Sequence, residues 1–102
     1  MKRNEFHEFV KEKCEELLEK LGKKGTEYAL QENAFHNFEE GCKIATSTSP
    51  EAFAWDLRTK HLQSIKDIIT ETTPVFNQGV IDEKCGDDIL YGFIIWALLT
   101  KT

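Results

Sequence analysis

Asp82-Glu-Lys-Cys-Gly-Asp-Asp-Ile-Leu-Tyr-Gly-Phe-Ile-Ile-Trp-Ala-Leu-Leu99 combines the densest cluster of acids in the chain with its most apolar run. This pattern predicts one helix. Asp82 is its expected N-cap, because a carboxylate there accepts a hydrogen bond from a free backbone N–H group. Glu83, Asp87 and Asp88 would then lie near the positive end of the helix dipole, which stabilises negative charge.

The second half of this helix is apolar on all sides. From Ile89 to Leu99 every residue except Gly92 is apolar or aromatic, so the apolar surface surrounds the helix and does not form a single stripe. The run is too short to cross a bilayer, which needs about 20 apolar residues. Three other short helices cannot cover it fully. We therefore expect a homo-oligomer whose interface includes this helix.

Length and charge restrict the remaining possibilities. A chain of 102 residues is expected to form one helical domain, residues 1–102. Its net charge of -5 disfavours general nucleic-acid or membrane-surface binding, since both need a basic face. Cys14, Cys42 and Cys85 are an odd number without metal-binding spacing, and the N-terminus lacks the apolar stretch of a secretion signal. These features predict a reduced, cytoplasmic protein.

Two further helices are predicted in the first half of the chain. Apolar residues recur at helical spacing from Asn4 to Leu21. Gly22 and Gly25 are expected to end that helix, because glycine readily takes the left-handed conformation found at helix ends. The next segment runs from Thr26 to Ala45, and Asn33 is the possible cap of its helix.

The clearest boundary is at Ser49-Pro50, where serine caps the helix and proline is its first residue. Apolar residues then keep helical spacing to near Glu71, and residues 70–81 are expected to be a loop before the last helix. No alternating pattern supports a sheet. The predicted fold is all-α, a compact four-helix domain.

Two polar clusters suit a nucleotide. One offers amides, an imidazole and a phenol to a base or sugar, and comprises Tyr28, Asn33, His36 and Asn37. Capping and turn contacts explain Asn33 equally well. The other places a cation, an imidazole and a hydroxyl on one side of the third helix, which suits a phosphate, and comprises Lys60, His61 and Ser64. The alternative is that Lys60 lies in solvent and His61 packs at the edge of the core.

A third cluster consists of Glu83 and Asp87, which are one turn apart on the last helix. Two carboxylates at this spacing can hold Mg²⁺ against a phosphate. Helix capping and compensation of the dipole explain the same residues equally well.

Five segments and Asp67 are distributed along the chain from Thr26 onward; the segments are Thr26-Glu-Tyr-Ala29, Asn33-Ala-Phe-His-Asn-Phe-Glu39, Ser49-Pro-Glu51, Lys60-His-Leu-Gln-Ser-Ile65 and Asp82-Glu-Lys-Cys-Gly-Asp87. Together they resemble a family of small, mostly uncharacterised phage-encoded proteins, and the resemblance extends over most of the chain from Thr26 onward. The last helix is also similar to the MazG-like all-α nucleoside triphosphate pyrophosphatases, whose acidic helices bind Mg²⁺. In those enzymes the second metal motif is Glu-x-x-Asp, whereas Lys84 stands three residues before Asp87 here.

The resemblance implies two main functions. The first is a phage protein in the cytoplasm of the infected host cell that sequesters a small, possibly cyclic, nucleotide such as a host immune signal, without turnover and without a cofactor. The second is a Mg²⁺-dependent nucleotide pyrophosphatase that uses Glu83 and Asp87. Lys84 in place of an acid favours binding without catalysis. A third alternative is an inhibitor that binds another protein through its acidic surface.

Overall fold

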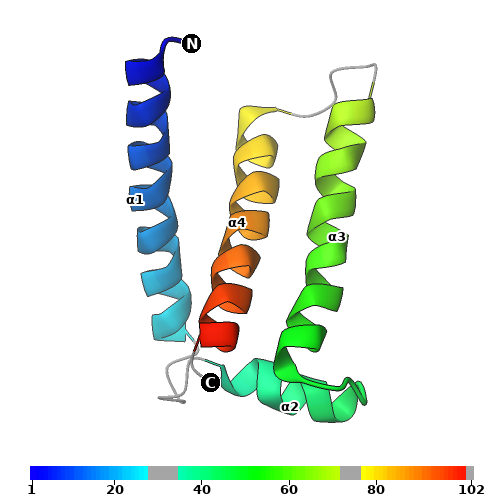
Figure 1. The fold of residues 1–102 in the computed structure, drawn as a ribbon. Coiled ribbons are helices and arrows are strands. Elements are labelled where there is room, and N and C mark those ends of the chain that lie inside the picture. Colours follow the sequence, from blue (N-terminus) through cyan, green and yellow to red (C-terminus); the bar gives the residue numbers. More distant parts are fainter. Residues whose placement is uncertain (28–34, 72–76, 101–102) are drawn as a thin grey trace. The chain divides into compact units, whose positions relative to one another are not determined.

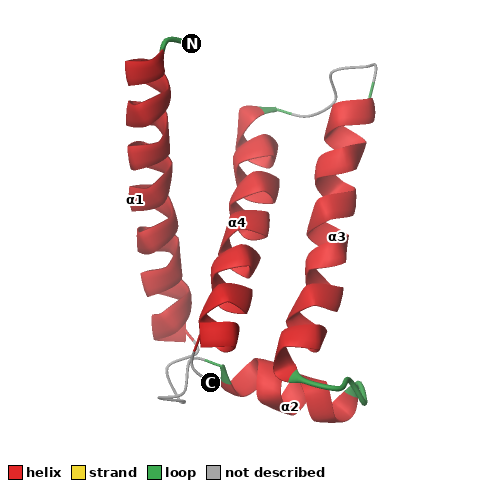
Figure 2. Ribbon diagram, viewed as in Figure 1, coloured by secondary structure: helices red, strands yellow, loops and turns green. Residues whose placement is uncertain are grey.

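The computed structural model describes residues 1–27, 35–71 and 77–100, and these ranges contain four α-helices and no strand. The helices are α1 (Arg3–Glu27), α2 (His36–Ile44), α3 (Pro50–Thr70) and α4 (Gln78–Thr100) (Figures 1 and 2). The all-α, four-helix prediction is confirmed for this part of the chain. None of the described helices is both long and apolar enough to cross a membrane.

The chain forms two compact units, Met1–Glu32 and Asn33–Thr102. The helix of the first unit is α1, which continues through Gly22 and ends at Glu27. The expectation that Gly22 and Gly25 end this helix is therefore wrong. Glycine inside a helix costs only about 1 kcal/mol relative to alanine, and the lysines and leucine beside Gly22 are good helix formers.

The surface of α1 carries both charged and apolar side chains. The ammonium group of Lys13 lies 3.2 Å from a carboxylate oxygen of Glu16, one turn further along. The apolar residues of the helix are exposed, with Phe6 at 58% and Leu18 at 69% of full accessibility. Since most of the stability of a helix in a protein comes from packing of its apolar face, an apolar partner surface would stabilise α1 further.

In the second unit, the predicted start of α3 is confirmed. Ser49 has extended backbone angles, and its hydroxyl accepts a hydrogen bond of 3.0 Å from the backbone N–H of Ala52. Pro50 is the first helical residue. The backbone N–H that proline lacks would have no hydrogen-bond partner within the helix at this position. The helix ends at Thr70, with Glu71 as C-cap, close to the predicted position.

The start of α4 differs from the prediction. Asn77 is its N-cap, because its side-chain oxygen accepts a hydrogen bond of 2.9 Å from the backbone N–H of Val80. The helix begins at Gln78, so Asp82 lies inside it and accepts a hydrogen bond from the Gln78 side chain. The predictions that Asp82 caps α4 and that the loop extends to Ile81 are wrong.

This earlier start also changes the electrostatic role of the acids on α4. The first turn of α4 contains no acid, and the dipole effect falls off within the first turn. Compensation of the dipole therefore does not explain Glu83, Asp87 and Asp88.

Close packing at one glycine joins α2 to α3. α2 begins at His36, after Phe35, which makes no capping bond through its side chain, and Asn33 lies outside the described residues. A Cβ added at Gly41 would collide with the ring of Phe53 on α3. Figure 1 shows α2 across the end of the α3–α4 pair at which α3 begins.

The core of the described residues is small. The buried apolar residues are Cys42, Ala54 and Leu98, and Leu98 is the largest of them. Several large apolar side chains are exposed, among them Ile69 at 76% and Trp96 at 67%. The second unit therefore has more apolar surface than its own packing covers.

Gly41→Ala tests the contact between α2 and α3. The added methyl group overpacks the contact with Phe53, and overpacking typically costs about 1–3 kcal/mol. Gly92→Ala is the matched control, because a methyl there would lie 3.6 Å from the nearest atoms of Arg58, an ordinary contact distance. Both changes gain the same helix propensity, so urea unfolding should show Gly41→Ala to be less stable than Gly92→Ala by about 1–3 kcal/mol. Equal stabilities would contradict the close contact.

Candidate functional site

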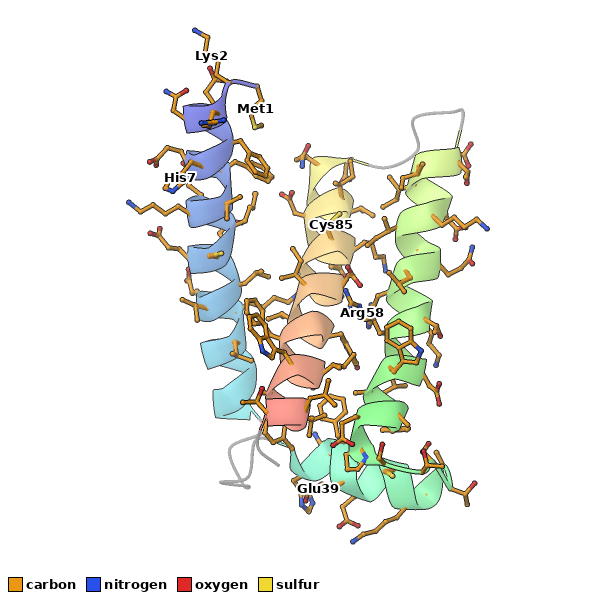
Figure 3. The ribbon with its side chains drawn as sticks, viewed as in Figure 1. Met1, Lys2, His7, Glu39, Arg58 and Cys85 are labelled. Carbon is orange, nitrogen blue, oxygen red and sulfur yellow. The ribbon has the colours of Figure 1, made fainter. Side chains whose placement is uncertain are left out.

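A hydrogen-bonded ion pair crosses the interface between α3 and α4. The Nε atom of Arg58 donates to the Oδ1 atom of Asp88 at 2.8 Å. The two side chains are only 26% and 16% exposed, so the pair is shielded from much of the solvent. Figure 3 shows Arg58 between the two helices. The hydrogen bond to Asp88 is the largest influence on Arg58 and raises the pKa of its guanidinium.

Two aromatic rings also meet across this interface, one from each helix. The ring centroids of His61 and Tyr91 are 4.7 Å apart, and the ring planes are tilted by 38°. The ring of Phe38 from α2 also contacts Tyr91, with the two ring centroids 6.0 Å apart and the ring planes nearly perpendicular. We call Arg58, His61, Asp88 and Tyr91 the α3–α4 layer. Phe38 borders this layer through its edge-on contact with Tyr91.

Arg58 reaches across to the backbone of α4. Gly92 lies beside the guanidinium, and a Cβ there would be 3.6 Å from both Nη atoms. Arg58 uses its Nε–H toward Asp88, whereas the four N–H groups on the Nη atoms are further potential donors. The layer thus combines a cation, an imidazole and a phenol within two turns of each helix.

The phenol of Tyr91 is electrostatically perturbed. Burial is the main cause that raises its pKa, and the negative charge of Asp87 adds to the effect. Both causes disfavour the phenolate, so Tyr91 is a neutral hydroxyl at physiological pH, able to donate or accept a hydrogen bond.

The structure brings together only some of the predicted ligand residues. Lys60 is exposed on α3, and the hydroxyl of Ser64 donates to the Lys60 carbonyl oxygen at 3.1 Å. His61 is half-buried against Tyr91, which matches the alternative that it packs at the edge of the core. A ring in that position can still present one edge to a ligand.

The predicted residues near α2 are less closely connected to the layer. His36 and Asn37 form the first turn of α2, and Asn37 is exposed. The described contact between α2 and the layer comes from the next residue, Phe38. Tyr28 and Asn33 lie outside the described residues.

The predicted metal ligands Glu83 and Asp87 are one turn apart on α4, with Glu83 exposed and Asp87 half-buried. Among the residues that the structure describes, no group of three or more His, Cys, Asp or Glu side chains is arranged to hold a metal ion. The two carboxylates would have to share a cation with ligands from elsewhere, such as phosphate oxygens.

The sequence analysis did not identify Arg58 or Tyr91 as site residues and gave Asp88 a different role. A signal was present, because Arg58 and His61 on one helix, and Asp88 and Tyr91 on the other, are each separated by three residues. Side chains at that spacing share a helix face. The pairing of these two faces requires knowledge of which helices are neighbours.

The pH dependence of Tyr91 tests the burial of the layer. In a Tyr28→Phe background, the near-ultraviolet phenolate absorbance of the folded protein should titrate at a pKa above the ordinary tyrosine value of about 10. Asp87→Asn should lower that pKa only partly, because burial is the larger cause. Since the folded pKa exceeds the unfolded one, the Tyr91 contribution to stability is full below pH ~10 and is lost as the pH rises through the folded pKa. A pKa of Tyr91 in the folded protein at or below the ordinary tyrosine value would contradict this environment.

No protein-family model, curated protein or solved structure matches this chain.

Proposed function

We propose that this protein binds a small phosphate-bearing nucleotide at the α3–α4 layer and does not turn it over. The observation that supports this most is the contact of His61 with Tyr91 one turn from the guanidinium of Arg58. A nucleotide needs an aromatic face or edge for its base and a cation for its phosphate. The layer offers both within a short distance along α3.

Charge also favours this location. The protein has a net charge of -5, so a phosphate is attracted only where cations gather locally. Arg58 lies one turn before His61 on α3, and the exposed Lys60 follows on an adjacent face, about 100° around the helix from His61. Because Asp88 compensates much of the charge of Arg58, we assign most of the attraction for a phosphate to Lys60, whose long side chain is flexible.

Binding without turnover lowers the free concentration of a ligand. Together with the resemblance to phage proteins, this leads us to propose that the ligand is a host signalling nucleotide, possibly cyclic, in the cytoplasm of an infected cell. This role needs no cofactor.

We also propose that the protein works as a homo-oligomer that assembles through α4. Ile89, Phe93 and Trp96 on this helix are exposed by 46%, 52% and 67%. The rings of Phe93 and Trp96 are stacked, with centroids 6.2 Å apart, so they form one continuous apolar surface. Contiguous exposed apolar surface of this kind marks sites of association.

A Mg²⁺-dependent pyrophosphatase is the second candidate. It is favoured by the position of Asp87, whose charge acts on Tyr91, because a cation held by Glu83 and Asp87 would then be close to the same layer. Lys84 lies between these two carboxylates in the sequence and opposes a bound cation.

A ligand screen followed by titration tests the proposed function. Thermal unfolding should be measured with cyclic mono-, di- and trinucleotides and with nucleoside triphosphates, with and without Mg²⁺. A ligand at 100 times its Kd adds about 2.7 kcal/mol of apparent stability. Calorimetric titration with the nucleotide that stabilises most should then show binding at least about tenfold weaker for Lys60→Ala, through loss of a charge-assisted hydrogen bond.

Lys66→Ala is the matched control, since Lys66 is also an exposed lysine on α3 and lies on a different face. Equal affinities for Lys60→Ala and Lys66→Ala would place the site elsewhere. Release of pyrophosphate from a triphosphate that disappears in Asp87→Asn would favour the enzyme instead.

A further inference from the structure

We propose that a second copy of the chain packs against α4 in antiparallel orientation, with Phe93 of each copy against Trp96 of the other. This inference rests on the association through α4 proposed above and specifies its partner, orientation and register. The surface involved is the α4 stripe, which we define as Ile89, Phe93, Trp96 and Thr100.

The α4 stripe lies on the side of α4 away from α3. Asp88 and Tyr91 contact α3, and Phe93 is two residues beyond Tyr91, about 200° around the helix. The apolar members of the stripe are roughly half to two-thirds exposed, whereas Gly86, earlier on the same face, is buried. The accessible stripe therefore covers only the second half of the helix.

The spacing of the stripe makes it self-complementary. Its residues are separated by four, three and four positions, which is the alternation of a coiled-coil seam. This order is the same in both directions along the helix. Two antiparallel copies therefore place Ile89 opposite Thr100 and Phe93 opposite Trp96, and the stacked aromatic pairs of both copies meet at the two-fold axis.

The charges of α4 select the antiparallel orientation. Residues 89–100 contain no charged side chain, whereas Asp82, Glu83 and Asp87 lie in the first half of the helix. In a parallel pair Asp82, which lies seven residues before Ile89 on the same face, would meet Asp82 of the second copy, and like charges repel. In the antiparallel register Asp82 lies beyond the overlap of the two stripes. Antiparallel helix dipoles also attract each other.

Light scattering of the full chain tests whether the stripe associates. The wild type should have twice the monomer mass of 11.8 kDa at micromolar concentration. Phe93→Glu should reduce it to the monomer mass, because the dimer would bury an unpaired charge. Ile69→Glu, at a 76% exposed position on α3, should leave the dimer unchanged. A monomeric wild type would overturn both the association and its geometry.

Disulfide cross-linking tests the orientation separately. In a background of Cys14→Ser, Cys42→Ala and Cys85→Ala, a mixture of Ile89→Cys and Thr100→Cys chains should form a mixed disulfide. Neither variant alone should cross-link, because the register separates the two copies of each position by about 16 Å along the helix axis, more than a disulfide spans. Self-cross-linking of Ile89→Cys alone would show a parallel pair and overturn the proposal, although the association would hold.

If the cysteine-free background fails to fold, the same variants can be made with the native cysteines present. Peptide mapping by mass spectrometry then identifies which cysteines are joined. The mixed disulfide of residues 89 and 100 supports the antiparallel pair, and a disulfide joining two copies of residue 89 contradicts it.

Discussion

The hydrogen bond between Arg58 and Asp88 fixes how α3 and α4 face each other. Both side chains are mostly shielded from solvent, and a shielded charge without a partner is costly. Sliding or rotating one helix against the other by a residue would leave both charges unpaired. The facing of these two helix surfaces also brings His61 beside Tyr91, because His61 shares a face of α3 with Arg58 and Tyr91 shares a face of α4 with Asp88.

The same pairing explains why α4 has two distinct surfaces. One face carries Asp88 and Tyr91 toward α3, and the other exposes Phe93 and Trp96. A helix that is apolar on nearly all sides is expected to be buried on several sides. The second unit supplies only part of that cover, since Leu98 is the one large side chain fully buried among the described residues. Association through the second face would bury the remainder.

Local signals in the sequence were sufficient for the helices but not for every boundary. Ser49-Pro50 was predicted correctly because capping depends on adjacent residues. The start of α4 was misplaced because Asn77 and Asp82 are both good caps, and the sequence does not say which one the chain uses. The end of α1 was misplaced because helix propensity around Gly22 outweighed the tendency of glycine to end a helix.

The site was only partly predictable for a different reason. His61 was identified from its neighbours on α3, but Tyr91 is 30 residues further along the chain, as Asp88 is from Arg58. Contacts at such separations depend on the pairing of helices, which periodicity does not determine. Glu83 and Asp87 were predicted as metal ligands from their charge and their spacing of one turn. In the structure, the negative charge of Asp87 contributes to the raised pKa of Tyr91.

A double-mutant cycle on Arg58→Met and Asp88→Leu tests most directly whether this ion pair organises α3 and α4. Urea unfolding of the wild type, both single variants and the double variant gives the coupling free energy between the two side chains. A partly shielded, charge-assisted hydrogen bond predicts a favourable coupling of about 1–3 kcal/mol, with each single variant less stable than the wild type. Single effects that simply add, to within about 0.5 kcal/mol, would contradict the account.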